Sequence, residues 1–345
     1  PGLRVSARSA SFSFKGKGTA PKEIAHQLGV NYLVEGSVRR SGSQARISVQ
    51  VTKGADGLQV WTNTYNRDIK DIFAVQDEIA TSVASALQLR FGTSVGSSAA
   101  TGKTKNPAAY EAFLRGREAW YHGRGDEARR LLEEAVKLDP GFATAHGALA
   151  ELLVQRAQDR GDSREQNFAQ AKAAAEKALS LDDRVVQAHN ALAEYAFHYA
   201  WDWEAEDRHM QRALAVDPNY YLAISHYGNH EIARNRLESG LAAHLKAKSL
   251  NPLRGSSQIA WTLTMLDRHD EAIRVAREIL AEHPNSGFAL FTLGEALFRG
   301  GQREEGLRML EDAAARMKED IFVNANLGWA YGRAGQKDKA LAAFK

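Results

Sequence analysis

The 345-residue sequence contains no cysteine, which excludes disulfide scaffolds, thiol catalysis and zinc–thiolate sites. It also lacks any uninterrupted apolar run near the ~20 residues that a membrane-spanning helix needs. Hydrophobic residues make up 44% of the chain and charged residues 25%, with a formal net charge of +3. This composition is typical of a soluble globular chain, and the length predicts two domains or one elongated array at roughly 100–200 residues per domain.

An initiator Met and a secretory signal are also lacking. The sequence begins at Pro1, and a strand-like segment, Leu3–Ala7, follows without a charged-then-apolar signal segment before it. We therefore expect a piece of a longer protein. Its expected location is the cytoplasm, or the periplasm if a membrane span precedes Pro1.

Positive charge is concentrated in the amino-terminal part of the chain. Residues 1–105 hold 14 Lys and Arg against 7 Asp and Glu, whereas residues 106–345 hold 31 against 35. A basic patch can bind nucleic acid, but here Arg39, Arg46 and Arg67 are scattered between strand-like stretches. We interpret them as a solvated face and expect no nucleic-acid partner.

A repeating unit occupies the chain from residue 107 onward. A small residue, preceded in all but the first unit by an apolar or aromatic one, recurs at intervals of 34, 43, 35, 32, 34 and 34 residues. Most units end in a phrase such as Leu138-Asp139-Pro140. Proline at that place ends one helix and prepares the next. The recurring small residues are Gly116, Ala150, Ala193, Gly228, Ala260, Gly294 and Gly328.

The unit resembles the tetratricopeptide repeat, a helix–turn–helix of 34 residues, over about 240 residues of the chain. The resemblance implies a mostly helical fold, a right-handed superhelix of about seven repeats over residues 107–345. The third unit departs from the pattern with Trp201-Asp202-Trp203 at its turn. The last unit stops inside its second helix at Lys345 without a polar cap, so we expect self-association through its apolar edge around Leu341 and Phe344.

Residues 1–92 lack the helical repeat and have a different sequence pattern. The segments 31–40, 45–53 and 58–67 are rich in β-formers and predict a three-stranded antiparallel meander. A short helix is expected at Pro21–Leu28 and an amphipathic one at Ile69–Leu89. Together they predict a small α+β domain, joined to the repeats by a flexible linker at 93–106.

Three phrases in this part, Ser9–Lys17, Leu28–Arg39 and Asp71–Ile79, are similar to the TolB amino-terminal-like domain. That family precedes tetratricopeptide repeats in bacterial signalling proteins. The resemblance implies a sensory or scaffolding role. It also implies an effector on the amino side: a winged-helix regulator, a class III nucleotide cyclase or a protein kinase.

No segment of the sequence completes a known catalytic or metal-binding motif. Gly96–Thr104 approaches a phosphate-binding loop but has five residues between its glycines and follows a helix. His226 and His230 have the i, i+4 spacing of zinc ligands, but the Glu of a metalloprotease motif is absent. Carboxylates and serines are expected at solvated helix positions throughout. We therefore expect no catalytic residue, no metal and no cofactor in this chain.

The remaining candidate is a concave groove lined by the first helix of each repeat. By 3.6-residue periodicity, positions next to the small residue and one turn later face it. Mixed aromatic, amide and charged groups there can hold an extended protein segment, although a solvated groove without a ligand remains the alternative. The candidate binding residues are Arg117, Trp120, Gln155, Glu194, Asn229, Trp261, Glu295 and Arg299. Positions of the same kind are Tyr121, Glu151, His198, Thr264, Trp329 and Arg333.

Two functions follow from the repeats and the resemblance. The first is a non-catalytic protein-interaction, scaffold or sensory module of a bacterial signalling protein. The second is the carboxy-terminal regulatory part of a class III adenylate cyclase, a protein kinase or a winged-helix transcriptional regulator. The set that clamps a terminal carboxylate in some repeat proteins is not evident, so we do not expect chaperone-tail binding.

Overall fold

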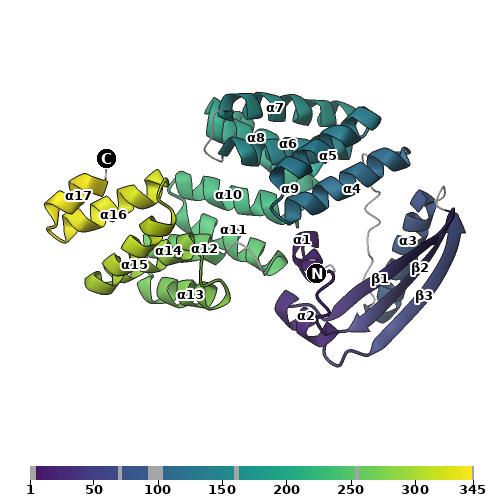
Figure 1. Ribbon diagram of the computed structural model, residues 1–345, viewed down its shortest axis with the longest axis horizontal. Helices are drawn as coiled ribbons and strands as arrows, with labels where there is room; N and C mark the ends of the chain where they lie inside the picture. The colour runs from purple at the N-terminus through teal and green to yellow at the C-terminus, as the bar shows by residue number, and fades with distance from the viewer. Residues whose placement is uncertain (1–4, 69–71, 92–103, 159–162, 253–255, 344–345) are drawn as a thin grey trace. The chain divides into compact units, whose positions relative to one another are not determined.

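The computed structural model describes residues 5–68, 72–91, 104–158, 163–252 and 256–343. The chain forms two compact units. The first unit comprises Pro1–Ala223 with Leu250–Pro252, and the second comprises Ile224–Ser249 with Leu253–Lys345. Within each unit, the helices and strands are labelled as in Figure 1.

The first unit begins with a small α+β layer. Three antiparallel strands, β1 (Tyr32–Ser41), β2 (Gln44–Lys53) and β3 (Gln59–Asp68), form a sheet in the order β1-β2-β3. The helix α2 (Pro21–Leu28) ends at the left-handed Gly29. The helix α3 (Ile72–Phe91) lies along the sheet (Figure 1). The predicted meander and both predicted helices are therefore confirmed.

The apolar alternation of the strands explains how α3 is held. Ile47, Val49 and Tyr65 are buried on one face of the sheet, and Val75 of α3 is buried against them. Arg67 of β3 and Glu78 of α3 add an ion pair of 2.9 Å. This pair is about half exposed, so the apolar contacts supply most of the stabilisation.

The start of the chain differs from the prediction. Residues 5–7 form no strand, and Arg8–Phe12 form a short helix, α1. Val5 is exposed, and the amide of Ala7 donates to the carbonyl of Leu250 at 2.7 Å instead of to a neighbouring strand. The predicted flexible linker falls mostly on residues 92–103, outside the described residues. Its last part is structured: Thr104 is buried and its hydroxyl donates to Asp139, and Asn106 caps the next helix.

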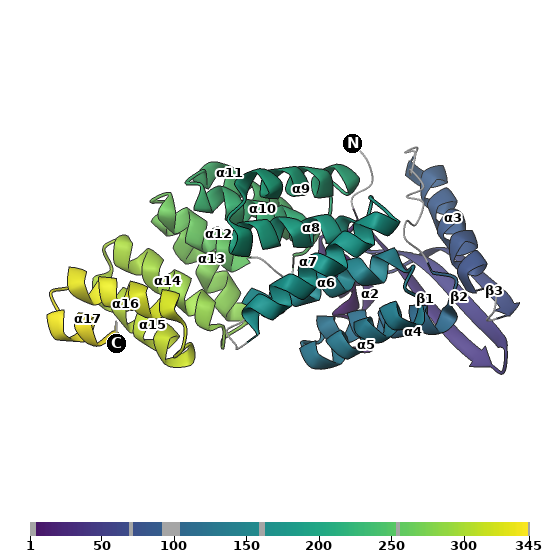
Figure 2. The same cartoon turned by 90° about the horizontal axis from the view of Figure 1, so that it is seen from above.

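Helix pairs follow in the rest of the first unit (Figure 2). Each pair is one repeat, and the second helix turns back against the first. The helices are α4 (Pro107–Tyr121), α5 (Gly125–Leu138), α6 (Ala143–Gln158), α7 (Arg164–Leu181), α8 (Val186–Tyr195) with the π-helical η2 (Ala196–Ala200), and α9 (Trp203–Val216). The longer interval of 43 residues between Ala150 and Ala193 includes residues 159–162, which lie outside the described residues.

The same pairing continues into the second unit. The helix α10 (Tyr221–Ala233) begins three residues before the boundary between the units. The remaining helices are α11 (Leu237–Leu250), α12 (Ser256–Met265), α13 (His269–Glu282), α14 (Gly287–Arg299), α15 (Arg303–Arg316), α16 (Ile321–Arg333) and α17 (Lys337–Ala343). In the part that the structure describes after Pro107, no strand occurs.

The recurring small residues lie where paired helices cross. A Cβ added at Gly116 would come within 3.0 Å of Leu132, and one added at Gly294 within 2.8 Å of Leu310. In both repeats the contacted leucine lies 16 residues later and is fully buried. The repeat therefore keeps a small residue so that the second helix can approach closely, because interiors are packed without spare volume.

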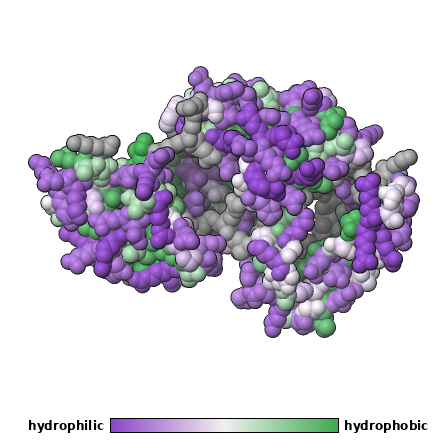
Figure 3. All heavy atoms as spheres, in the orientation of Figure 1, coloured by the Kyte–Doolittle hydropathy of each residue, from purple (hydrophilic) through white to green (hydrophobic). Residues whose placement is uncertain are grey.

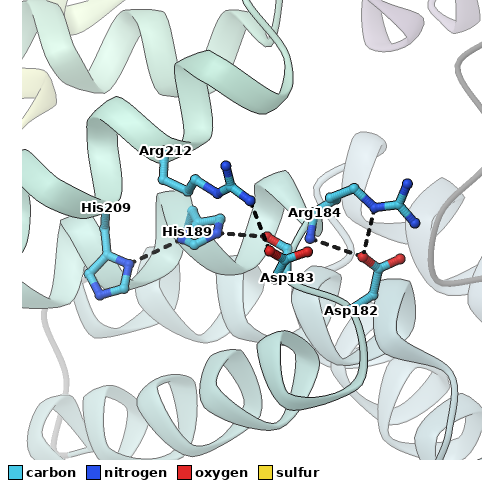
Figure 4. Close-up of polar contacts among 6 residues, drawn as sticks. All are labelled: Asp182, Asp183, Arg184, His189, His209 and Arg212. Atoms are coloured by element: carbon cyan, nitrogen blue, oxygen red, sulfur yellow. Dashed lines mark hydrogen bonds and ion pairs between the residues drawn. The ribbon is translucent and has the colours of Figure 1, made fainter.

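A histidine ring bonds some first helices to the preceding loop. Nε2 of His146 lies 3.1 Å from the carbonyl of Pro140, and Nε2 of His189 lies 2.9 Å from the carbonyl of Asp183. Each histidine bonds the residue six positions earlier, so the two rings make the same contact in successive repeats. Nδ1 of His189 also lies 3.2 Å from Nδ1 of His209 on α9 (Figure 4).

In each repeat whose turn the structure describes, the turn between the two helices holds one residue in the left-handed region. Trp201 adopts it with φ 54°, and this conformation costs a residue with a Cβ about 1–2 kcal/mol relative to glycine. The third repeat also reaches its turn one residue later, and the π-helical η2 takes up that extra residue. The other residues at this turn position are Gly123, Asn235, Asp267, Gly301 and Gly335.

Apolar residues are exposed in a scattered pattern, and the face shown in Figure 3 is mostly hydrophilic. Leu341 of α17 is 57% exposed, while Phe344 lies outside the described residues. No helix of the described residues is long and apolar enough to cross a membrane.

Candidate functional site

The position just after the small residue of each first helix carries a chemically varied set. In the first unit it is occupied by Arg117, Glu151 and Glu194, and in the second by Glu295 and Trp329 among others. The three glutamates are at most 6% exposed. The expectation that carboxylates lie at solvated positions throughout is therefore wrong: helix packing covers this position, and hydrogen bonds compensate the loss of water.

Glu151 on α6 is the centre of a polar cluster in the first unit. Its carboxylate accepts hydrogen bonds from the hydroxyl of Tyr220, at 2.8 and 2.7 Å, and from Nδ2 of Asn190, at 2.8 Å. Burial raises the pKa of Glu151 to about 7, although these hydrogen bonds and the charge of Arg117 oppose the rise. Burial also raises the pKa of Tyr220 well above its ordinary value. At neutral pH this carboxyl is therefore divided between its charged and neutral forms.

Arg117 on α4 belongs to the same cluster. Its Nη2 donates to the hydroxyl of Tyr121, and the guanidinium lies 5.3 Å from that ring and 5.8 Å from the ring of Phe113. Its Nε is buried and has no hydrogen-bond partner among the described residues. Arg117 is thus positioned by aromatic faces, as planar guanidinium groups often are.

Other groove residues of the first unit bond to each other across neighbouring first helices. Nε1 of Trp120 on α4 donates to Oε1 of Gln155 on α6. Gln158 on α6 donates to Glu194 on α8 at 2.9 Å, and His198 lies 3.5 Å from the same carboxylate. The sequence-predicted residues Trp120 and Gln155 therefore lie together, and Glu194 is tied into the same face.

In the second unit the groove position of the sixth repeat is again a buried glutamate. Nε of Arg299 donates to Oε2 of Glu295 at 2.8 Å, and the guanidinium lies 4.3 Å from the ring of Trp329. Burial raises the pKa of Glu295, while the bond to Arg299 opposes the rise. Trp329 remains 37% exposed and contacts Phe298 edge-on. A planar cation stacked on an exposed indole thus faces outward here.

Trp261 and Asn229 complete the predicted set. The ring of Trp261 on α12 meets that of Phe322 on α16 edge-on at 5.8 Å, and Phe322 is 44% exposed. Asn229 on α10 is exposed. Thr264 is buried and bonds the carbonyl of Ala260, so it is no groove residue.

Sequence reasoning missed four participants: Asn190, Tyr220, Gln158 and Phe322. Among these four, only Asn190 could have been recognised from the sequence. It lies three residues before the small residue of its repeat, where the other repeats have Phe, Gly, Ser or Ala. Tyr220 reaches Glu151 from 69 residues away. No local spacing rule could place it there.

The comparisons with known proteins agree with this architecture. Residues 113–159 and residues 258–286 each match the family described as tetratricopeptide repeat. The helical part is a tetratricopeptide-repeat array. A chain in the crystal structure of the APC/C hetero-tetramer Cut9–Hcn1 superposes with a TM-score of 0.53 and 15% identity, covering 64% of this chain and 42% of that chain. At that identity the likeness shows the fold alone.

Two further proteins resemble the chain. A tetratricopeptide repeat protein from Parabacteroides merdae gives a TM-score of 0.48 with 16% identity, over 69% of this chain and 91% of that one. A protein of Rhizobium meliloti named putative adenylate cyclase 3 is 37% identical over 152 residues, which are 43% of this chain and 26% of that protein. The aligned part is thus about a quarter of the relative's length.

Proposed function

We propose that the chain is a non-catalytic protein-interaction module of a bacterial signalling protein, and that the first helices of its repeats hold an extended protein segment. Repeats of this family present rows of separated side chains instead of one closed pocket, which suits a peptide better than a small molecule. The observation that carries the proposal is the outward pair of Arg299 and Trp329, together with the half-exposed Phe322 about two turns earlier on the same helix. Tryptophan and arginine are the side chains that most often dominate binding energy.

The first unit contributes differently. Its groove residues Arg117, Glu151 and Glu194 bond mainly to the chain itself. We therefore assign them to positioning the first helices, and we assign direct contact to the exposed residues Trp329 and Phe322. A rigid surface loses less side-chain entropy when it binds, so such internal bonds favour affinity.

Selection of a displayed random 12-residue peptide library on the whole chain tests the proposal. The best peptide is then titrated against the wild type and Trp329→Ala by isothermal calorimetry. We expect at least about a tenfold loss, equal to about 1.4 kcal/mol, with unchanged circular dichroism. Trp201→Gly, which removes another exposed indole, is the matched control and should retain the affinity. Equal affinity of Trp329→Ala would contradict the proposal.

A second proposal concerns the parent protein. The 37% identity to a putative adenylate cyclase favours a cyclase over a kinase or a winged-helix regulator as the effector. In that case this chain is a regulatory part, and we expect it to form no cyclic AMP from ATP by itself. Reading the gene upstream of Pro1 tests this, because cyclase catalytic motifs there would support the assignment and kinase or winged-helix motifs would refute it.

We further propose that the amino-terminal layer, β1 to β3 with α2 and α3, is the TolB amino-terminal-like domain and that the chain is cytoplasmic. The order of the elements and the turn at Gly29 are compatible with the resemblance of Leu28–Arg39 to that domain. A fusion of the chain to a fluorescent protein that folds only in the cytoplasm would report its location in the native host.

A further inference from the structure

The turn of the third repeat carries a residue that folding does not favour. Gly, Asn or Asp occupies the left-handed position of the other described turns, and these residues tolerate it best. Trp201 occupies it in the third repeat and is 69% exposed. It makes no aromatic stacking contact with any described residue. A bulky side chain is thus held in a strained conformation without the burial that would compensate the strain.

The residues around Trp201 form a fixed aromatic surface. Trp203 is 42% exposed and its ring meets Phe197 edge-on at 5.4 Å. Tyr199 is 36% exposed and its ring lies 5.2 Å from that of the fully buried Phe168. We call Tyr199–Glu204 the aromatic turn. The rings of Trp203 and Tyr199 pack against the repeat, while the ring of Trp201 is exposed to solvent.

Acidic side chains accompany the aromatic turn. Asp202 and Glu204 are exposed within it, and Glu165 on α7 hydrogen-bonds Tyr199. Arg164 brings a positive charge nearby, but its Nη2 donates to the carbonyl of His198 and its guanidinium lies 5.3 Å from the ring of Phe168. The charged residues within the aromatic turn are Asp202, whose carboxylate also accepts a hydrogen bond from the amide of Ala205 at 2.9 Å, and Glu204, so the aromatic turn is net acidic.

We propose that the aromatic turn is a docking surface for a basic segment of a partner protein, separate from the groove of the first helices. Lysine and arginine side chains lay their stems and cations on indole faces, and the carboxylates of Asp202 and Glu204 complement their charge. The charge selects this partner, because an acidic or purely apolar segment would gain nothing from the carboxylates. A glycine at position 201 would suit the fold better, so the tryptophan is explained by binding.

The test uses the whole chain and two synthetic 12-residue probes, Ac-(Arg-Ser-Gly)4-amide and Ac-(Glu-Ser-Gly)4-amide. Tryptophan fluorescence and calorimetry measure binding at 50 and 150 mM salt. We expect the arginine probe alone to bind, more weakly at the higher salt because exposed charges are screened. Trp201→Gly should lower the affinity at least about tenfold, and Glu204→Gln by about threefold, equal to about 1.4 and 0.6 kcal/mol. Asn235→Gly, at the same turn position of the fourth repeat, is the matched control and should bind as the wild type does.

Thermal unfolding supplies the second readout. Trp201→Gly should raise the melting temperature by about 1–4 °C, because the strain is removed and no burial is lost. A lower melting temperature would assign Trp201 to folding and overturn the proposal. So would unchanged affinity in Trp201→Gly, equal binding of the glutamate probe, or no binding of the arginine probe. Failure of the groove proposal would show instead as equal affinity of the library-selected peptide for Trp329→Ala and the wild type, which the arginine-probe titrations do not measure.

Discussion

Replacing Glu151 by glutamine should remove part of the pH dependence of the free energy of unfolding. The ordinary pKa of this carboxyl is 4.5 and burial raises it to about 7 in the folded chain. Between these pH values the folded chain binds the proton more tightly than the unfolded chain does. The free energy of unfolding therefore falls as the pH rises from 4.5 to 7, and the loss is complete above pH 7. The shift corresponds to about 3 kcal/mol, at 1.36 kcal/mol per pKa unit.

Glu151→Gln keeps an acceptor for Tyr220 and Asn190 but stays neutral at every pH. We expect it to match the wild type at pH 5 and to exceed it by up to about 3 kcal/mol at pH 8. Because the chain has two compact units, amide hydrogen exchange in α6 is the suitable assay, since it reports the local free energy of opening.

The control for this substitution is Glu134→Gln. Glu134 is 48% exposed and pairs with Arg130 at 3.5 Å, and such surface pairs contribute at most about 1 kcal/mol. Its effect should be small and nearly constant from pH 5 to 8. If Glu151→Gln also shows a difference that does not change with pH, the carboxyl is not titrating in this range and the reasoning is refuted.

Three other expectations follow from the geometry. Gly294→Val should destabilise the second unit by about 1–3 kcal/mol in urea unfolding, since its side chain would collide with Leu310. Burial lowers the pKa of His209 to about 4, so acid should destabilise the chain below about pH 6.5, and His209→Gln should weaken that pH dependence of the melting temperature. Trp261→Ala should weaken binding of the library-selected peptide at least about tenfold with little change in helicity; a loss of helicity would assign Trp261 to packing through its contact with Phe322.

The fold was largely predictable because its signals are local or periodic. Small residues at Gly116 and Gly294 mark helix crossings, and the alternation around Ile47 and Val49 marks a half-buried strand. The helix Arg8–Phe12 was not predictable in the same way. It has five residues, and its short run of Ser, Ala and Phe fits a strand as well as a helix until tertiary contacts decide.

The candidate site was predictable only in part. Periodicity correctly brought Trp120 to Gln155 and placed Glu295 on the same face as Arg299. It could not show that Glu151 would be buried, because that depends on Tyr220 from two repeats later. The spacing of residues in the sequence predicts which face of a helix a side chain lies on. How deeply that side chain is buried, and which residues it bonds, depend on tertiary packing.

Contacts that skip a repeat change how the groove can work. Repeat arrays usually make contacts only between neighbours. Here the hydroxyl of Tyr220, at the start of the fourth repeat, bonds Glu151 in the second, and within the second unit Trp261 of the fifth repeat meets Phe322 of the seventh. These contacts link repeats that are not neighbours in the chain. A bound segment must then rest on the outer atoms of these side chains or displace them, so substitutions such as Tyr220→Phe should alter affinity by changing the spacing of the helices rather than by removing a direct contact.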